Sequence, residues 1–250
     1  MWSELDALPI GSIAFQDCSG AAACRGDDQA SYVHQGAEVI KVERPEGGDD
    51  ARGWGPPFWK GVATTFQAMN HGKKSIAVDL KDPEQLAWLK RELSRSRAVW
   101  KVIASDMPLG LVVLDADKHV EAVAQGDPGA PLGRELQIAE LLRHIKHRRI
   151  TGTLWLTADV HYTSAQHYRP ERAAFRDFAP FWEFVTGPLA AGGFPAVGLD
   201  ATFGPDQVFV RAPDRANVSP AESPQYFGAV DIDAGSGELT VRLRAEGGRE

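Results

Sequence analysis

Apolar residues recur at helical spacing directly after Pro83. Asp82 suits the N-cap position of a helix and Pro83 its first position, and Leu86, Leu89 and Leu93 then share one face. We therefore predict an amphipathic helix that starts at Pro83.

A second helical pattern leads directly into an extended one. Between Arg134 and about His147, the apolar residues follow the i, i+3, i+4, i+7 spacing of a helix that buries one face. These residues are Ile138, Leu141, Leu142 and Ile145. The run 153–157 is then apolar and rich in β-favouring side chains, which predicts a buried strand. A helix followed by a buried strand is an arrangement in which α/β enzymes place ligands at the strand's end.

Several shorter patterns complete an α/β prediction. Alternating or apolar runs predict strands at 39–42, 75–80, 99–104 and 111–114, and a C-terminal hairpin of 226–232 and 239–243 around a turn at 233–237. The segment 170–182 predicts a short helix followed by aromatic packing. Five aromatic residues are expected in the core: Trp155, Phe178, Phe181, Trp182 and Phe184.

Two polar side chains follow the strand 153–157 at a spacing of two. In an extended backbone, such residues point the same way, so the Asp159 carboxylate and the His161 imidazole are expected to converge beyond the strand. A hard oxygen ligand beside a nitrogen ligand suits a hydrolytic metal centre. On spacing alone, hydrogen bonds to a loop are an equal alternative. Tyr162 and His167 are close enough in sequence to line a pocket there, although packing is the commoner role for such a tyrosine.

Composition narrows the classes of function. The 250 residues, 43% hydrophobic and 24% charged, suffice for one large globular domain or two small ones. The net charge of −7 argues against a general nucleic-acid binder. No run reaches the length of a membrane span, so we expect no membrane partner. The chain's start has no basic segment followed by a long apolar one. The missing signal peptide indicates either a cytoplasmic location for the chain as it stands or a chain whose natural N-terminus has been lost.

Seven stretches from Gln85 onward carry a family resemblance. In order, they are QLAWLKREL, WKVIASDMPLGLVV, EAVAQGDPGAPLGRELQIAELLRHIK, WLTADVHY, ERAAFRDFAPFWEFVTGPLAAGGF, LDATFGP and YFGAVDID. Together they resemble the C-terminal part of the alkaline phosphatase D family of metallophosphoesterases. The resemblance implies a layered sheet-and-helix fold, a small-molecule phosphoester as substrate, and calcium and iron or other divalent metals as cofactors.

The same resemblance assigns metal ligands. The family's metal-binding Asp and His correspond to Asp159 and His161, and Tyr162 falls in the same motif. In the family, the remaining ligands lie mostly in the N-terminal half, in stretches absent here. The resemblance therefore implies an incomplete fold and metal centre, and an inactive phosphatase is the alternative interpretation.

Two earlier stretches carry a different resemblance. The segments 36–58, GAEVIKVERPEGGDDARGWGPPF, and 66–84, FQAMNHGKKSIAVDLKDPE, are similar to the N-terminal region of the class III CoA-transferases. Arg44, Lys73 and Lys74 match positions that contact the coenzyme's phosphates and adenine in that family. NHGKKS departs from the family's N-x-N-K-[RK]-S pattern, and the family's catalytic Asp belongs to a later region that this chain lacks. The resemblance thus implies CoA binding without transferase activity.

The two resemblances divide the chain into three segments. Residues 1–35 are unassigned, 36–84 are CoA-transferase-like and 85–250 are phosphatase-like, so the sequence is that of a chimera. Three hypotheses follow. The chain is a metal-dependent phosphoester hydrolase, a non-catalytic chimeric or truncated protein, or a CoA-binding fragment.

Overall fold

A computed structural model of the protein describes most of the chain after residue 39. The described residues are 40–43, 50–53, 55–69, 74–77, 83–105, 107–114, 117–127, 129–188, 191–233 and 235–245. The chain divides into two compact units, Met1–Lys81 and Asp82–Glu250, which are considered separately. Within the described ranges, no helix has the length and apolar character needed to cross a membrane.

In the first unit, the described residues form only short elements. They are β1 (Ile40–Glu43), η1 (Asp50–Gly53), β2 (Phe58–Trp59), β3 (Val62–Ala63), α2 (Thr64–Met69) and β4 (Lys74–Ala77). Strands β1 and β4 pair in parallel, with Ile40 opposite Lys74. Both strands overlap the runs predicted at 39–42 and 75–80, because each run is a short apolar or alternating segment between loop-forming residues.

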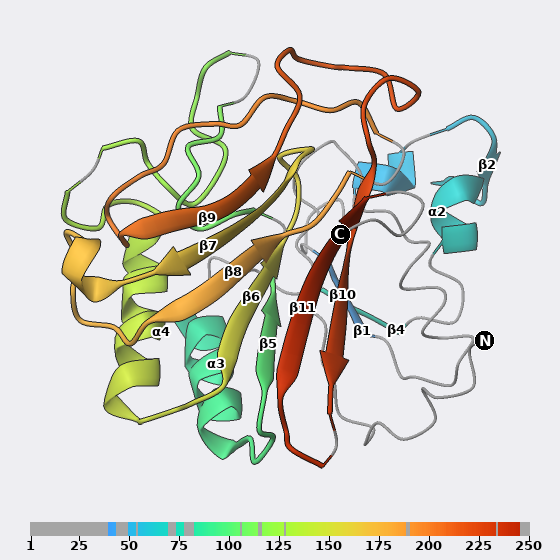
Figure 1. The fold of residues 1–250 in the computed structure, drawn as a ribbon. Helices are drawn as coiled ribbons and strands as arrows, with labels where there is room; N and C mark the ends of the chain where they lie inside the picture. Colours follow the sequence, from blue (N-terminus) through green and yellow to red (C-terminus); the bar gives the residue numbers. More distant parts are fainter. Residues whose placement is uncertain are drawn as a thin grey trace. The chain divides into compact units, whose positions relative to one another are not determined.

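The second unit contains a mixed sheet of five strands (Figure 1). Its elements up to the sheet's last strand are α3 (Pro83–Arg95), β5 (Lys101–Ala104), α4 (Glu135–His147), β6 (Thr153–Thr157), β7 (Thr163–Tyr168), η2 (Pro170–Arg172), β8 (Phe181–Val185) and β9 (Pro205–Arg211). The strand order is β5-β6-β8-β7-β9, in which β5, β6 and β8 are parallel and β7 is antiparallel to both neighbours. The predicted α/β class is confirmed, as are the starts of both long helices to within one residue.

Helices α3 and α4 cover one face of this sheet, and Figure 1 shows both on the same side. Their apolar stripes meet the sheet in one core, which includes Leu93, Leu141, Leu142, Ile145, Ile103, Trp155, Tyr168 and Phe181. A polar side-chain contact also joins the two helices: Ser94 Oγ lies 2.8 Å from His144 Nε2. The helical periodicity therefore identified the faces that are buried.

Strands β7, β8 and β9 were not expected as strands. Strand β7 shows why, because its sequence is largely polar and yet Thr163, Ser164 and Gln166 are fully buried. Hydrogen bonds inside the sheet engage at least one polar atom of each side chain: Thr163 Oγ1 donates to Val185 O at 2.9 Å, and Gln166 Nε2 donates to Ser164 Oγ at 2.7 Å. A central strand of this kind has no hydropathy signal, since hydrogen bonds rather than apolar side chains make its burial possible.

Two expectations about packing are corrected. The run 111–114 is not a strand, because Leu111 and Leu114 each make only an isolated bridge to a loop. Trp182 is not a core residue, because its exposed fraction is 39%. Residues alternate between the faces of β8, so Phe181 and Glu183 are buried and Trp182 lies on the other face.

The predicted C-terminal hairpin is confirmed. It consists of β10 (Tyr226–Ile232) and β11 (Leu239–Ala245), paired antiparallel. The turn closes where expected, since Gly237 N donates to Asp233 O at 2.8 Å. Trp100 Nε1 donates to Gly237 O at 2.7 Å, which joins the turn to the residue before β5.

Candidate metal and phosphoester site

The segment after β6 lies at the carboxyl edge of the parallel strands. Ala104 at the end of β5 pairs with Leu156, and Thr157 at the end of β6 pairs with Val185 at the end of β8. The loops that follow these three strands therefore leave the same edge of the sheet, where α/β proteins commonly bind ligands. Asp159 is the second residue beyond β6.

The backbone at this point is left-handed, which corrects the expectation of an extended segment. Asp159 has φ 65° and His161 has φ 59°. Val160 N donates to Ala158 O at 2.8 Å, so Asp159 is the centre of a γ-turn with positive φ, a rare and strained conformation. Such strain persists only where the surrounding structure holds it, and it concentrates at functional sites.

The orientation of the His161 ring is set by the loop that follows β8. Its Nδ1 lies 2.7 Å from Gly192 O, and because a carbonyl oxygen only accepts, Nδ1 carries the hydrogen. In the neutral ring, the lone pair is then on Nε2. Phe194 contacts the imidazole edge-on at 5.3 Å between ring centroids, and Phe194 N donates to His161 O at 3.3 Å. An imidazole whose second nitrogen donates to a carbonyl is the usual arrangement of a metal-binding histidine.

The carboxyl group of Asp159 is half-buried near a second acidic side chain. Burial raises the pKa of Asp159, the negative charge of Glu121 adds to this effect, and His161 opposes it. A hard anionic oxygen in such surroundings suits a divalent cation. Across the part of the chain that the structure describes, no group of three or more His, Cys, Asp or Glu side chains is placed to hold a metal. By the chemistry of their side chains, Asp159 and His161 fit a divalent metal, although the described residues supply no third ligand beside them.

Tyr162 and His167 occupy different environments. Tyr162 is 1% exposed and its Oη accepts a hydrogen bond from Val197 N at 3.3 Å. Burial raises the pKa of Tyr162 to about 12, so the hydroxyl stays neutral and the ring packs beneath the site. The structure does not bring His167 to the end of β6, because His167 pairs with Trp182, which in turn pairs with Leu154 near the start of β6. The His167 and Trp182 rings stack at 4.5 Å.

Glu183 is a buried acid that sequence analysis did not single out. Its Oε1 accepts from Leu109 N at 2.9 Å and from Thr157 Oγ1 at 3.1 Å, while Oε2 accepts from Tyr168 Oη at 2.5 Å. Burial raises the pKa of Glu183 to about 7, although these three hydrogen bonds oppose the shift. Glu183 thus ties β8 to the last residue of β6, two positions before Asp159. A charged residue alone in the aromatic run FWEFV was the available sequence signal.

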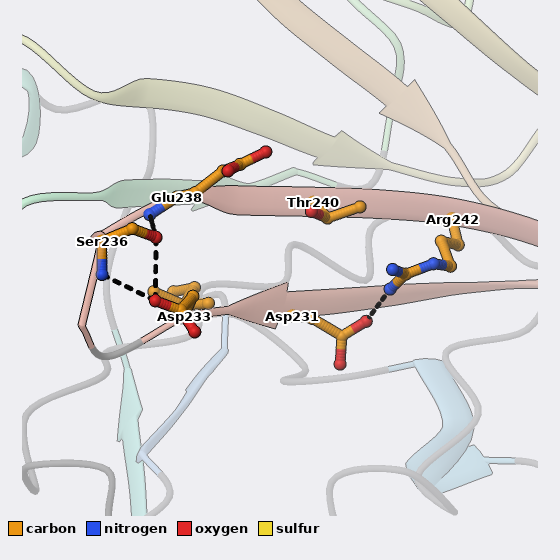
Figure 2. Close-up of a pocket in the computed structure, with 7 residues that line it drawn as sticks. Asp231, Asp233, Ser236, Glu238, Thr240 and Arg242 are labelled. Atoms are coloured by element: carbon orange, nitrogen blue, oxygen red, sulfur yellow. Dashed lines mark hydrogen bonds and ion pairs between the residues drawn. The ribbon is translucent and has the colours of Figure 1, made fainter.

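A pocket on the C-terminal hairpin is also rich in acidic residues (Figure 2). Two of its three acidic residues, Asp231 and Asp233, have carboxylates engaged within the hairpin itself. Asp233 Oδ1 accepts from Ser236 N at 2.6 Å and from Ser236 Oγ at 2.8 Å, and Asp231 is paired with Arg242. These contacts explain the tight turn and leave the metal-binding prediction with the segment after β6.

Most of the residues expected to contact CoA lie outside the described residues. Arg44 and Lys73 lie outside the described residues. Lys74 is the first residue of β4, for which only the backbone is described. Their predicted role in CoA binding therefore stays a prediction.

Comparison with known proteins confirms the similarity to CoA-transferases over short stretches. The chain is 58% identical over 55 residues to succinyl-CoA:glutarate CoA-transferase of Mus musculus, which covers 22% of this chain and 13% of that protein. It is 53% identical over 62 residues to succinate–glutarate CoA-transferase of Agrobacterium fabrum, covering 22% of this chain and 16% of the relative. Succinyl-CoA–D-citramalate CoA-transferase of Chloroflexus aurantiacus is 48% identical over 56 residues, covering 22% and 14%. The chain thus spans about a seventh of the length of these relatives.

A second comparison covers most of the chain. The sequence profile of the PhoD-like phosphatases matches residues 64–243, a range that includes both long helices, the five-stranded sheet and the Asp159–His161 segment. The match begins inside the CoA-transferase-like segment 36–84 and extends through most of the C-terminal hairpin. The resemblance first noted from Gln85 onward is confirmed, and the chain belongs to the PhoD-like phosphatase family.

Proposed function

We propose that this chain is a metal-dependent phosphoester hydrolase in which Asp159 and His161 bind a divalent cation, calcium, iron or a comparable ion. The observation that carries the proposal is the His161 imidazole. It lies just beyond a parallel strand, in a family motif, with Nδ1 bound to Gly192 O and Nε2 available to a ligand. The incomplete metallophosphoesterase architecture is part of the same proposal.

The residues of the site have separable roles. A divalent ion held by Asp159 and His161 would supply Lewis acidity toward a phosphoryl oxygen of a small-molecule phosphoester. Asp159 contributes a charged oxygen ligand, and the γ-turn at Asp159 fixes its position relative to His161. The Gly192 carbonyl selects the tautomer of His161 that can bind a metal through Nε2. Tyr162 packs with Val160 in the hydrophobic cluster under this segment, and its hydroxyl stays protonated because its pKa is about 12.

Metal content tests the proposal most directly. Purified wild-type protein, Asp159→Ala, His161→Ala and the control His167→Ala are compared by elemental analysis after dialysis. We expect metal in the wild type and in His167→Ala, and its loss from the two site variants. Metal-free wild-type protein that remains folded by circular dichroism would overturn the proposal. So would metal-dependent hydrolysis of p-nitrophenyl phosphate that survives the Asp159→Ala/His161→Ala double variant.

A non-catalytic chimeric or truncated protein is the second candidate. It is favoured by the finding that the described residues contain no group of three or more side chains placed to hold a metal, whereas a hydrolytic metal centre needs at least three protein ligands. This candidate predicts no stoichiometric metal and no turnover, with the fold of the second unit intact.

A CoA-binding fragment is the third candidate, favoured by the 58% identity to a CoA-transferase over 55 residues. Arg44, Lys73 and Lys74 are the proposed contacts with the coenzyme. Hydrogen exchange with and without CoA tests it, since binding should slow exchange in residues 36–84. Identical exchange in that segment at saturating CoA would end this candidate.

A further inference from the structure

The loop 191–199 is held across the segment that carries the proposed ligands. Phe194 N donates to His161 O at 3.3 Å, and Val197 N donates to Tyr162 Oη at 3.3 Å. On its outer side, Gly193 exchanges two backbone hydrogen bonds with Val218, at 2.8 and 3.0 Å. Because the loop is bonded on both sides, its side chains have defined positions relative to His161.

One of these side chains is a partly exposed aromatic ring. Phe194 is 39% exposed, although its ring contacts the His161 ring edge-on at 84°. Leu199, at the end of the same loop, is 42% exposed. Leaving large apolar side chains in water forgoes the stabilisation of burying them, so an apolar surface held against a proposed metal ligand suggests a binding role.

The chemistry of the loop restricts what it can recognise. Its sequence, AGGFPAVGL, contains no charged side chain and no side-chain hydrogen-bond donor. A sugar or nucleotide needs polar partners to be selected, because unpaired polar groups are costly to desolvate. A flat apolar group needs only the ring face and the aliphatic surface.

We propose that Phe194 receives the organic group of the phosphoester and makes the site selective for aryl esters. The inference rests on the proposed function, since it requires the phosphoryl group to bind at Asp159 and His161. The Phe194 and His161 ring centroids are 5.3 Å apart, so a phenyl ester whose phosphoryl group binds beside His161 would have the Phe194 ring as a neighbour. Aromatic pairs favour edge-to-face or offset stacking at such distances.

Binding of two phosphonates tests the proposal without requiring turnover. The metal-loaded wild type, Phe194→Ala, Phe194→Tyr and Trp182→Ala are titrated calorimetrically with phenylphosphonate and with methylphosphonate. Trp182 is a matched control, because it is also an aromatic residue with 39% exposure but pairs with Leu154, away from the end of β6. We expect phenylphosphonate to bind the wild type about 2- to 10-fold more tightly than methylphosphonate. The preference should persist in Phe194→Tyr and Trp182→Ala and disappear in Phe194→Ala.

Two results would overturn this assignment in different ways. An equal preference in wild type and Phe194→Ala, with metal bound, would refute the aryl selectivity and leave the proposed metal site standing. Failure of both phosphonates to bind refutes the substrate assignment, and the metal content of the same samples then decides whether the proposed function fails with it.

Discussion

Glu183 should make the second unit less stable as the pH rises through neutrality. Its carboxyl group is fully buried in the sheet, where its three observed partners, Leu109 N, Thr157 Oγ1 and Tyr168 Oη, are all neutral donors. Replacing Glu183 with Gln mimics the protonated acid. The amide oxygen can accept from Leu109 N and Thr157 Oγ1, and the amide nitrogen can donate to Tyr168 Oη.

The sign and size of the effect follow from the pKa. Burial raises the pKa of Glu183 from 4.5 to about 7, so between these values the folded state holds a proton that the unfolded state has released. The contribution of Glu183 to the free energy of unfolding is therefore largest below pH 4.5, and it is lost as the pH rises through 7. At about 1.4 kcal/mol for each tenfold change in proton affinity, the loss is on the order of 3 kcal/mol.

Urea unfolding of the wild type and Glu183→Gln at pH 5, 6, 7 and 8 measures this directly. Trp155 is 3% exposed and pairs with Glu183, so its fluorescence reports the unfolding of this part of the sheet. Because the two proteins share every other titrating group, the difference in their unfolding free energies isolates Glu183. We expect Glu183→Gln to gain stability relative to the wild type by on the order of 3 kcal/mol between pH 5 and 8.

A pH-independent difference would refute the reasoning. It would mean that Glu183 has the same proton affinity in the folded and unfolded states. The exposed Glu171→Gln variant is the matched control, and its stability relative to the wild type should not follow this pH dependence.

Three further predictions concern single positions. A Cβ at Gly192 would meet Asn217 Oδ1 at 2.4 Å, but this oxygen ends a side chain that can rotate away, so Gly192→Ala should leave the Gly192 carbonyl against His161, the proposed metal ligand. Calorimetric metal titration should show a nearly unchanged affinity, and a loss of about tenfold would contradict this. Hydrogen bonds, chiefly from Lys146, lower the pKa of Asp177 from 3.8 to about 2, so the stabilisation by its ion pairs should be full above pH 3.8 and lost as the pH falls through about 2. An NMR titration should show this low midpoint and its rise in Lys146→Ala, and an ordinary midpoint in the wild type would refute it. A Cβ at Gly152, where φ is 69°, would lie 2.0 Å from Val99 O. Gly152→Ala should therefore lower the free energy of unfolding by at least about 1–3 kcal/mol. A loss below about 0.5 kcal/mol in urea unfolding would contradict this.

Some of the fold was predictable because it depends on neighbouring residues. The start of α3 follows from Pro83 and the leucine spacing, and the hairpin turn follows from the Asp233–Gly237 segment. Strand β7 was not predictable in this way. It becomes a central strand only when β8 and β9 pair with it on either side and Val185 of β8 accepts from Thr163 Oγ1.

The candidate site was likewise predictable only in part. The motif identified Asp159 and His161, but their spacing of two predicted an extended backbone, whereas both residues have positive φ. The ring orientation of His161 depends on Gly192, 31 residues away. No periodicity of the local sequence contains that information.

The sequence by itself determined the α/β class, the two amphipathic helices, the buried strand β6, the hairpin and the family, because each depends on local spacing or on an ordered set of motifs. Only the tertiary structure decided which polar groups could be buried and which aromatic rings remained exposed. It brought Glu183 to the last residue of β6 and left Trp182 and Phe194 partly in water. The physical reason is that burial and hydrogen bonding of these residues depend on partners from other strands and loops, whose positions are defined only when the sheet has formed.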